Sequence, residues 1–417
     1  MLIVIEAPGK VAHLRSILRK IGFDGSVLAT GGHIYRTPKS LYPVYINHNL
    51  EPTKLEWTHP EYVDHLVMSL REAEEIIIAT DPDSEGHLIA TDVANLARKE
   101  NPDIKISRMY MFGMDEHHVF DALSNTLEYD ESLALPAMRR RSIDRIIAAS
   151  MSDPDKKIFI GRVMAQTLSA MQHDEGMISE PVDTIMTGTE FMYHISRKMD
   201  VNPIKISEHM QKLYESGRMS YPRSDSQRVT AYASHHVADM YGAYVKPDEY
   251  IDDGAHPAPY PISKSDIDVP YEYMSGEDAT LSAISRHWCR AGKGGPFIPM
   301  DEQHPESPEQ KTMRYMMTNN VGRPGTTPYI ANRIVEHYGL INKRGEVNEK
   351  GIQFLKQGNP VATPGIPEKI SKWIDFGGNI QSVLEGSKLW DIVSENMNSE
   401  PCSKLGSAYE GEISFAM

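Results

Sequence analysis

The feature that most constrains the fold is the run Ile76-Ile77-Ile78-Ala79-Thr80, which leads directly into an acidic turn. A continuous run of this kind is typical of a strand buried on both faces of a parallel sheet. A helix carrying Ile89, Val93 and Leu96 on one face follows the turn. Residues 2–5 form a similar run with their own turn and helix. The sequence therefore predicts an α/β domain near the N-terminus.

Three carboxylates lie at alternate positions on the turn after the 76–80 run: Asp81, Asp83 and Glu85. They repel one another unless a cation lies among them, and hard oxygen ligands suit Mg²⁺. Glu6 follows the first strand, and open parallel sheets place their sites at the carboxyl ends of strands. We therefore expect these four residues to form a Mg²⁺ site. The alternative is an acidic helix N-terminus, which the helix dipole stabilises.

A second candidate site is Tyr221-Pro222-Arg223, which follows a helix that should stop near Gly217. Proline fixes its own φ and favours an extended conformation at Tyr221, so the phenol has a defined position beside Arg223. Tyrosine is a possible nucleophile towards a phosphodiester, and a guanidinium binds phosphate oxygens. The alternative is a surface turn.

A chain of 417 residues should hold two to four domains. It has two cysteines, Cys289 and Cys402, which excludes a disulfide framework or a four-cysteine zinc ribbon within it. No apolar run approaches the ~20 residues of a membrane helix, and the N-terminus lacks a signal-peptide pattern, so we expect a cytoplasmic protein. The net charge of −15 confines any nucleic-acid contact to local basic patches such as residues 139–145.

Further along the chain the pattern changes. Residues 132–177 are expected to be helical, residues 184–195 to be β-like, and helices return at 280–291 and 311–320. His256 lies in a proline-rich loop, and a lone histidine of this kind is more often a surface or packing residue than a functional one.

Taken in order, these segments resemble the motifs of type IA DNA topoisomerases. Glu6 and Lys10 together with the Asp81–Gly86 turn look like the two halves of a Toprim metal site. The other matching segments are Gly32-His33-Ile34, residues 140–147, Gly161-Arg162-Val163, Tyr221 to Ser226, His256-Pro257-Ala258, Gly322 to Thr326, residues 347–351 and, more weakly, residues 384–393.

The resemblance implies that Tyr221 cleaves single-stranded DNA and forms a 5′-phosphotyrosyl intermediate, which relaxes negatively supercoiled DNA or decatenates it. Bond energy is kept in the intermediate, and the lack of a Gly-x4-Gly-Lys-Ser/Thr loop agrees with a reaction without nucleotide. The resemblance also implies roles for particular residues. The implied catalytic residues are Tyr221, Arg223, Glu6, Lys10 and His256. The implied DNA-binding residues are Arg140, Asp144, Arg162, His33, Arg323 and Thr326. Mg²⁺ would be held by Glu6, Asp81, Asp83 and Glu85, mainly for resealing.

Two departures from the family pattern stand out. Ser84 and His87 replace an arginine and a glutamate of the acidic motif, which affects metal affinity and phosphate contacts at that turn. The intervals from Arg162 to Tyr221 and from His256 to Arg323 are much shorter than in cellular members, where they contain a β-rich arch. We therefore expect a multidomain type IA topoisomerase-like fold with an α/β Toprim domain, mostly helical domains and a stunted arch.

The expected division is a Toprim domain at 1–130, a helical DNA-binding domain from 131–180 and 292–417, an arch remnant at 181–195 and a catalytic-tyrosine domain at 196–291. The expected partners are single-stranded DNA segments and negatively supercoiled duplex, with no nucleotide and no membrane, for a monomer associated with the nucleoid or encoded by a phage or mobile element. Three alternatives remain: a nicking-closing or strand-transfer enzyme, an inactive single-strand-binding relic, and a Toprim primase or nuclease.

Overall fold

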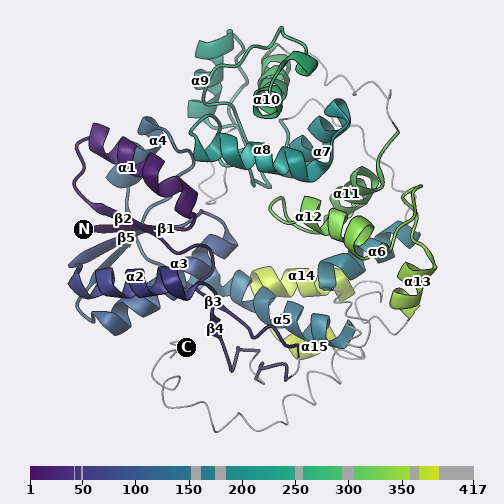
Figure 1. Ribbon diagram of the computed structural model, residues 1–417, viewed down its shortest axis with the longest axis horizontal. Coiled ribbons are helices and arrows are strands. Elements are labelled where there is room, and N and C mark those ends of the chain that lie inside the picture. The colour runs from purple at the N-terminus through teal and green to yellow at the C-terminus, as the bar shows by residue number, and fades with distance from the viewer. Residues whose placement is uncertain are drawn as a thin grey trace. The chain divides into compact units, whose positions relative to one another are not determined.

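The computed structural model of the chain describes residues 1–41, 43–47, 50–151, 161–173, 185–248, 257–293, 305–356 and 366–384. Contacts within the chain divide it into two compact units. Unit 1 consists of residues 1–111, 116–162 and 358–417, and unit 2 of residues 112–115 and 163–357. Figure 1 labels most of the helices and strands of both units.

Unit 1 contains a five-stranded sheet with the strand order β2-β1-β5-β6-β7. All neighbours pair in parallel except the last two, which are antiparallel. The strands are β1 (Leu2–Ile5), β2 (Ser26–Ala29), β5 (Glu75–Ala79), β6 (Lys105–Arg108) and β7 (Leu127–Glu128). Ile5 is level with Ala79, so the chain leaves β1 and β5 at the same edge of the sheet. The α/β fold expected for this part of the chain is confirmed.

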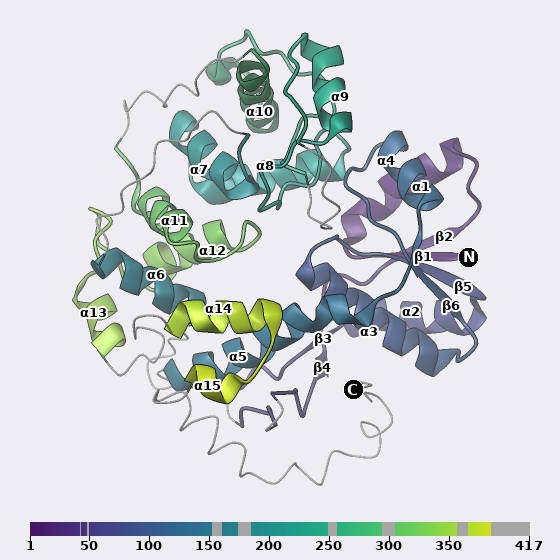
Figure 2. The same ribbon diagram turned by 180° about the vertical axis from the view of Figure 1, so that it is seen from behind.

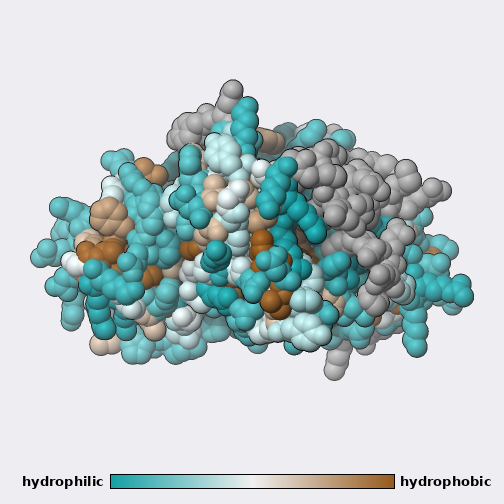
Figure 3. Space-filling view, turned by 90° about the horizontal axis from the view of Figure 1, so that it is seen from above, coloured by the Kyte–Doolittle hydropathy of each residue, from teal (hydrophilic) through white to brown (hydrophobic). Residues whose placement is uncertain are grey.

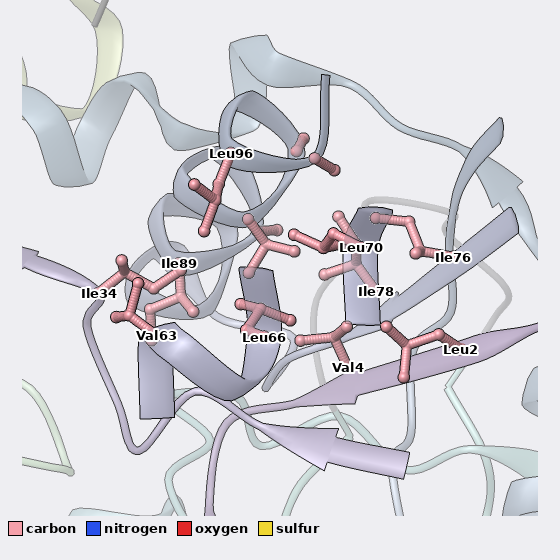
Figure 4. Packing of buried hydrophobic residues seen from close by; sticks show 14 of the residues in the cluster. Leu2, Val4, Ile34, Val63, Leu66, Leu70, Ile76, Ile78, Ile89 and Leu96 are labelled. Atoms are coloured by element: carbon pink, nitrogen blue, oxygen red, sulfur yellow. The ribbon is translucent and has the colours of Figure 1, made fainter. Parts of the chain in front are cut away.

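Helices cover both faces of this sheet (Figures 1 and 2). One face carries α1 (Val11–Lys20) and α4 (Glu116–Ser124), and the other carries α2 (Pro60–Glu72) and α3 (Ser84–Glu100). Alternate side chains of a strand face the same side, so Leu2, Val4, Ile76 and Ile78 all point towards α2 and α3. Figure 4 shows them packed against Val63, Leu66, Leu70, Ile89 and Leu96. Burying each such side chain contributes about 1.5–3 kcal/mol.

A second cluster in unit 1 joins α5 to α14 and α15, with Ile143, Ile147, Ile370 and Leu384 among its members. The remaining elements of unit 1 are η1 (Pro8–Lys10), β3 (Tyr35–Arg36), β4 (Glu56–Trp57), η2 (Glu131–Ala134), α5 (Leu135–Met151), α14 (Ile366–Phe376) and α15 (Ile380–Leu384).

Unit 2 is helical in its described residues apart from its loops and turns. Its elements are α6 (Arg162–His173), α7 (Gly188–Met199), α8 (Pro203–Glu215), α9 (Ala231–Tyr241), η3 (Tyr271–Tyr273), α10 (Gly276–Gly292), α11 (Pro308–Thr318), α12 (Thr327–Asn332), the π-helical turn η4 (Arg333–His337) and α13 (Glu349–Lys356). The first residue of α6 falls in unit 1. Helix α8 packs against α7, α10 and α12. Gly217, just past the end of α8, has a φ of +71°, which suits glycine at a helix stop.

The prediction of a β-like stretch at 184–195 is wrong, because its described residues lead into α7 and form the first eight of that helix's twelve residues. Thr187 caps this helix by accepting a hydrogen bond from the backbone N–H of Glu190, whose side chain accepts one from Thr187 in return. The size of the arch and the four-part domain division stay predictions. None of the helices in the described ranges is long and apolar enough to cross a membrane. Hydrophilic residues predominate on the face drawn in Figure 3, and hydrophobic ones form small groups there.

Candidate active site

The acidic turn between β5 and α3 is folded tightly. Asp83 caps α3 by accepting a hydrogen bond from the backbone N–H of Gly86 at 2.8 Å. The hydroxyl of Thr80 donates to the carbonyl oxygen of Gly86 at 2.6 Å. A Cβ on Gly86 would lie 1.8 Å from the carbonyl oxygen of Asp81, so only glycine fits there. Asp81 and Asp83 are thus held on one short, rigid turn.

Lys10 and Glu6 reach the same edge of the sheet from β1. Lys10 is 2% exposed, and its Nζ donates to Oδ1 of Asp81 at 2.6 Å. Glu6 is half-buried directly after β1. Burial, followed by the negative charges of Asp81 and Asp83, raises the pKa of Glu6 to about 7, although Lys10 acts in the opposite direction. Three carboxylates therefore act on one another at this edge.

Among the residues that the structure describes, no three His, Cys, Asp or Glu side chains are grouped in a way that could hold a metal ion. The donor set of Glu6, Asp81 and Asp83 nevertheless suits Mg²⁺ in kind, because carboxylate oxygens are its preferred protein ligands. The repulsion among these groups, which adds to burial in raising the pKa of Glu6, is what a divalent cation would relieve. In this structure the ammonium group of Lys10 neutralises part of that charge.

Glu85, in the first turn of α3, has other partners. Its Oε2 lies 3.1 Å from Nε2 of His33, and its Oε1 accepts from Nη1 of Arg140 at 2.5 Å. Burial alone raises the pKa of Glu85, but the hydrogen bond to His33 and the charge of Arg140 outweigh it and lower the pKa. Arg140 also donates to Oγ of Ser84 at 3.1 Å. Glu85 is thus held as a carboxylate by unit 1 itself.

Two more arginines of unit 1 pair with aspartates. Arg141 donates towards Nδ1 of His33 at 3.3 Å and lies 3.9 Å from the buried Asp92. Burial raises the pKa of Asp92 to about 6. Arg162 donates from Nε to Oδ1 of Asp144 at 2.6 Å. Asp144 and Arg162, which were both expected to bind DNA, are therefore partners of each other.

The loop of Tyr221 lies in unit 2 and is fixed through its backbone. The N–H of Tyr221 donates to the carbonyl oxygen of Phe112 at 3.0 Å. Ser220 donates from its N–H to the carbonyl oxygen of Tyr260 at 3.0 Å and accepts from the Tyr260 N–H through Oγ at 2.8 Å. The ring of Tyr221 is 2% exposed and packs edge-on against Tyr214. The phenol therefore has a defined position.

Two glycines bring other segments of unit 2 close to this loop. The N–H of Gly188 donates to the carbonyl oxygen of Ser224 at 2.8 Å. A Cβ on Gly325 would lie 3.0 Å from Cδ of Arg223, so the segment of Gly325 runs along the Arg223 side chain. Arg323 also forms a 3.6 Å ion pair with Asp225. Exposed Thr326, which precedes α12, accordingly lies on a segment that contacts the tyrosine loop.

The expected site residues thus form two groups. Unit 1 holds Glu6, Lys10, His33, Asp81, Asp83, Glu85, Arg140, Asp144 and Arg162, and unit 2 holds Tyr221, Arg223, Arg323 and Thr326. His256 lies outside the described residues. Reasoning from the sequence missed Arg108 and Gly188, because nothing in their local sequence shows that their partners are residues 78–81 and 222–224.

Comparisons with known proteins agree with this picture. Residues 1–111 match the Toprim domain family. DNA topoisomerase 1 of Mycoplasmoides gallisepticum is 25% identical over 282 residues, which cover 58% of this chain and 37% of that protein. DNA topoisomerase 1 of Thermotoga maritima is 30% identical over 171 residues, which cover 40% of this chain and 26% of that protein.

Among solved structures, full-length topoisomerase I from Thermotoga maritima matches with a TM-score of 0.68 and 18% identity. The match covers 95% of this chain and 90% of that chain. The fold is therefore that of a multidomain topoisomerase I with an N-terminal Toprim domain. The motifs of the chain resemble those of type IA DNA topoisomerases, and the aligned segments span 37% and 26% of the length of the two curated relatives.

Proposed function

We propose that the chain is an ATP-independent type IA DNA topoisomerase in which Tyr221 cleaves single-stranded DNA. The observation that carries the proposal is the placement of Tyr221 and Arg223 on one loop, which contacts Phe112, Gly188 and Gly325. A phenol with a fixed guanidinium two residues away provides a nucleophile and a group that stabilises charge on a phosphate. The relatives named DNA topoisomerase 1 support the same assignment.

In the proposed cleavage step, the phenolic oxygen of Tyr221 bonds to phosphorus and the bond from phosphorus to the 3′-oxygen breaks. The phenol loses its proton and the 3′-oxygen gains one, with Glu6 as the group that handles the proton at the 3′-oxygen. Arg223 and Lys10 bind the phosphate oxygens. Resealing reverses both bond changes, so no nucleotide is consumed. His256 is a further proposed catalytic residue.

The proposed metal ligands are Glu6, Asp81, Asp83 and Glu85, and Mg²⁺ bound there would supply positive charge near the phosphate during resealing. In this structure Asp81 is bonded to Lys10, and Glu85 to Arg140 and His33. These contacts must rearrange before both carboxylates can serve as ligands. The residues proposed to position the strand are His33, Arg140, Asp144, Arg162, Arg323 and Thr326.

Strand access requires a change around Tyr221, since its side chain is 2% exposed. The proposed outcome of repeated cleavage and resealing is relaxation of negatively supercoiled DNA or decatenation. A nicking-closing enzyme with the same Tyr221 chemistry is the second candidate, because the intervals from Arg162 to Tyr221 and from His256 to Arg323 leave little room for an arch. Relaxation of a negatively supercoiled plasmid, compared with oligonucleotide cleavage, separates the two.

The deciding experiment uses one single-stranded oligonucleotide labelled at either its 3′ or its 5′ end. A 5′-phosphotyrosyl link predicts a labelled protein adduct with the 3′ label, and a shorter free fragment ending in a 3′-hydroxyl with the 5′ label. Tyr221→Phe should form neither product while keeping the thermal midpoint of the parent protein. An adduct carrying the 5′ label, or an adduct formed by Tyr221→Phe, would contradict the proposal.

A further inference from the structure

Arg108, the last residue of β6, buries its guanidinium against the acidic turn. It is 2% exposed. Nη1 donates to the carbonyl oxygens of Ile78 at 2.8 Å and Met109 at 3.1 Å. Nη2 donates to the carbonyl oxygens of Thr80 at 2.8 Å and Asp81 at 3.2 Å. Most of these acceptors belong to the end of β5 and the start of the turn.

Two of these carbonyls, those of Thr80 and Asp81, need a donor at this place, whereas the carbonyl of Ile78 also accepts from the backbone N–H of Met109. Thr80 and Asp81 lie past the last residue of β5, where the sheet ladder no longer supplies N–H groups, and buried carbonyls without partners are costly. Ile78 is level with Arg108 in the parallel register, so the side chain starts beside the strand end. The rigid guanidinium fork, with five N–H donors on two terminal nitrogens and Nε, can bond several carbonyls at once.

The charge of Arg108 also lies close to the acidic groups. A guanidinium stays charged near neutral pH in proteins, so Arg108 places a positive charge beside the turn. The ring of Tyr110 lies 4.6 Å from the guanidinium.

Lys10 and Arg108 affect the turn differently. The ammonium of Lys10 bonds one of the two carboxylate oxygens of Asp81, the atoms through which Asp81 would bind a metal ion. Arg108 bonds the main-chain carbonyl oxygen of Asp81 and leaves the carboxylate to other partners. Arg108 can therefore shape the turn and offset its negative charge without competing for a ligand atom.

We propose that Arg108 is a positioning residue that holds the Thr80–Asp83 turn in the shape needed to bind a divalent cation, without itself contacting the ion or DNA. The proposal rests on the proposed metal site and adds a residue that the family motifs did not single out. Residues that orient metal ligands typically change metal affinity by about 10–100-fold when they are replaced.

The test measures Mn²⁺ binding to the full chain by electron paramagnetic resonance, at a temperature well below unfolding. Arg108→Lys keeps the charge but has a single nitrogen, and Arg108→Met removes the donors entirely. We expect the dissociation constant for Mn²⁺ to rise at least about tenfold in the methionine variant, and by a smaller but clear factor in the lysine variant. Amide hydrogen exchange at residues 80–86 should accelerate in both variants.

Leu70→Ala is the matched control for lost stability, because Leu70 is buried in the unit 1 core among residues of the sheet and α3 (Figure 4). It should lower the thermal midpoint yet leave the Mn²⁺ affinity within about twofold of the parent. An unchanged affinity in Arg108→Lys, an equal loss in Leu70→Ala, or no Mn²⁺ binding by the parent protein would each overturn the proposal. If Arg108→Met does not fold, the lysine variant decides.

The proposed topoisomerase activity and the proposed role of Arg108 can be tested separately. Tyr221→Phe should bind Mn²⁺ as the parent protein does, because Tyr221 is not a proposed ligand. If the parent protein shows no oligonucleotide cleavage while the Mn²⁺ affinities follow the expected order, the role of Arg108 stands and the topoisomerase activity does not.

Discussion

Gly188 donates its backbone N–H to the carbonyl oxygen of Ser224 at 2.8 Å, which ties the first turn of α7 to the loop that carries Tyr221. A Cβ on Gly188 would lie 2.1 Å from the carbonyl oxygen of Pro222. The loop can adopt this position only because residue 188 has no side chain.

Gly188→Ala should therefore displace the tyrosine loop. A displacement of about 1 Å at a reacting group can cost about 100-fold in rate, so we expect single-turnover oligonucleotide cleavage to fall by that order. Gly161→Ala is the control, because a Cβ at Gly161 meets no atom within 4 Å. Cleavage by Gly188→Ala at the parental rate would show that the contact does not position Tyr221.

Replacing Glu306 should destabilise unit 2. Its carboxylate accepts from the hydroxyl of Tyr193 at 2.5 Å and from Nη2 of Arg314 at 2.9 Å, and it lies 3.6 Å from Arg197. Glu306→Gln leaves two arginines facing a neutral group, so we expect a loss of about 2 kcal/mol, seen as a lower midpoint in urea.

The control for Glu306 is Glu277→Gln, since Glu277 pairs with Lys212 at the surface. Surface pairs contribute little, so this change should stay within about 0.5 kcal/mol of the parent. Equal effects of the two substitutions would mean that the burial of Glu306 has no energetic consequence.

His194 should make unit 2 less stable in acid. Burial lowers the pKa of His194 to about 4, below its ordinary value of 6.5. Between these values the unfolded chain binds a proton that the folded protein does not, so stability falls as the pH drops from about 6.5 to 4. We expect this pH dependence, up to about 3 kcal/mol, to disappear in His194→Gln, measured by urea unfolding across that range. Parallel curves for both proteins would contradict it.

Asp92 should give the stability of unit 1 the opposite pH dependence to that which His194 gives unit 2. Its pKa is raised to about 6 by burial, so the folded protein binds a proton that the unfolded chain releases between pH 4 and 6. The contribution of Asp92 to the free energy of unfolding therefore becomes less favourable as the pH rises from 4 to 6. Relative to Asp92→Asn, the parent protein should lose stability on going from pH 4 to 6. A constant difference in unfolding midpoint would show that Asp92 keeps its ordinary pKa.

Chelation of divalent ions should affect resealing more than cleavage. Cleavage has Arg223 and Lys10 as its proposed cations, whereas resealing is the step for which Mg²⁺ is proposed. With excess chelator, the 3′-labelled adduct should persist and added Mg²⁺ should restore the resealed strand. Equal loss of adduct and resealed product on chelation would contradict this division.

Strands β1 and β5 were readable from the sequence because they are continuous apolar runs, and their parallel pairing agrees with the helices between them. Helix α7 could not be predicted in this way, because the β-branched and aromatic residues of this stretch each favour a strand when considered alone. They are Ile185, before the helix, and Phe191, Tyr193 and Ile195 within it. The segment is nevertheless helical, because the capping box at Thr187 and the burial of Phe191, Met192 and Ile195 on one face stabilise a helix.

For the candidate site, the sequence indicated which residue types matter but not which of them meet. Lys10 bonds to Asp81, and Arg140 to Glu85, across long stretches of chain. Such pairs depend on strand order and helix packing rather than on local pattern. The contacts of Arg108 could not be predicted from local pattern either, since a charged residue at a strand end is usually a surface residue.

The ammonium of Lys10 has one more consequence. A tethered cation cannot be diluted away, so its effective concentration beside Asp81 is independent of the ions in solution. A divalent ion that arrives must compete with this resident amine as well as with water. The same tether gives the protein a folded, charge-compensated resting form when divalent ions are scarce.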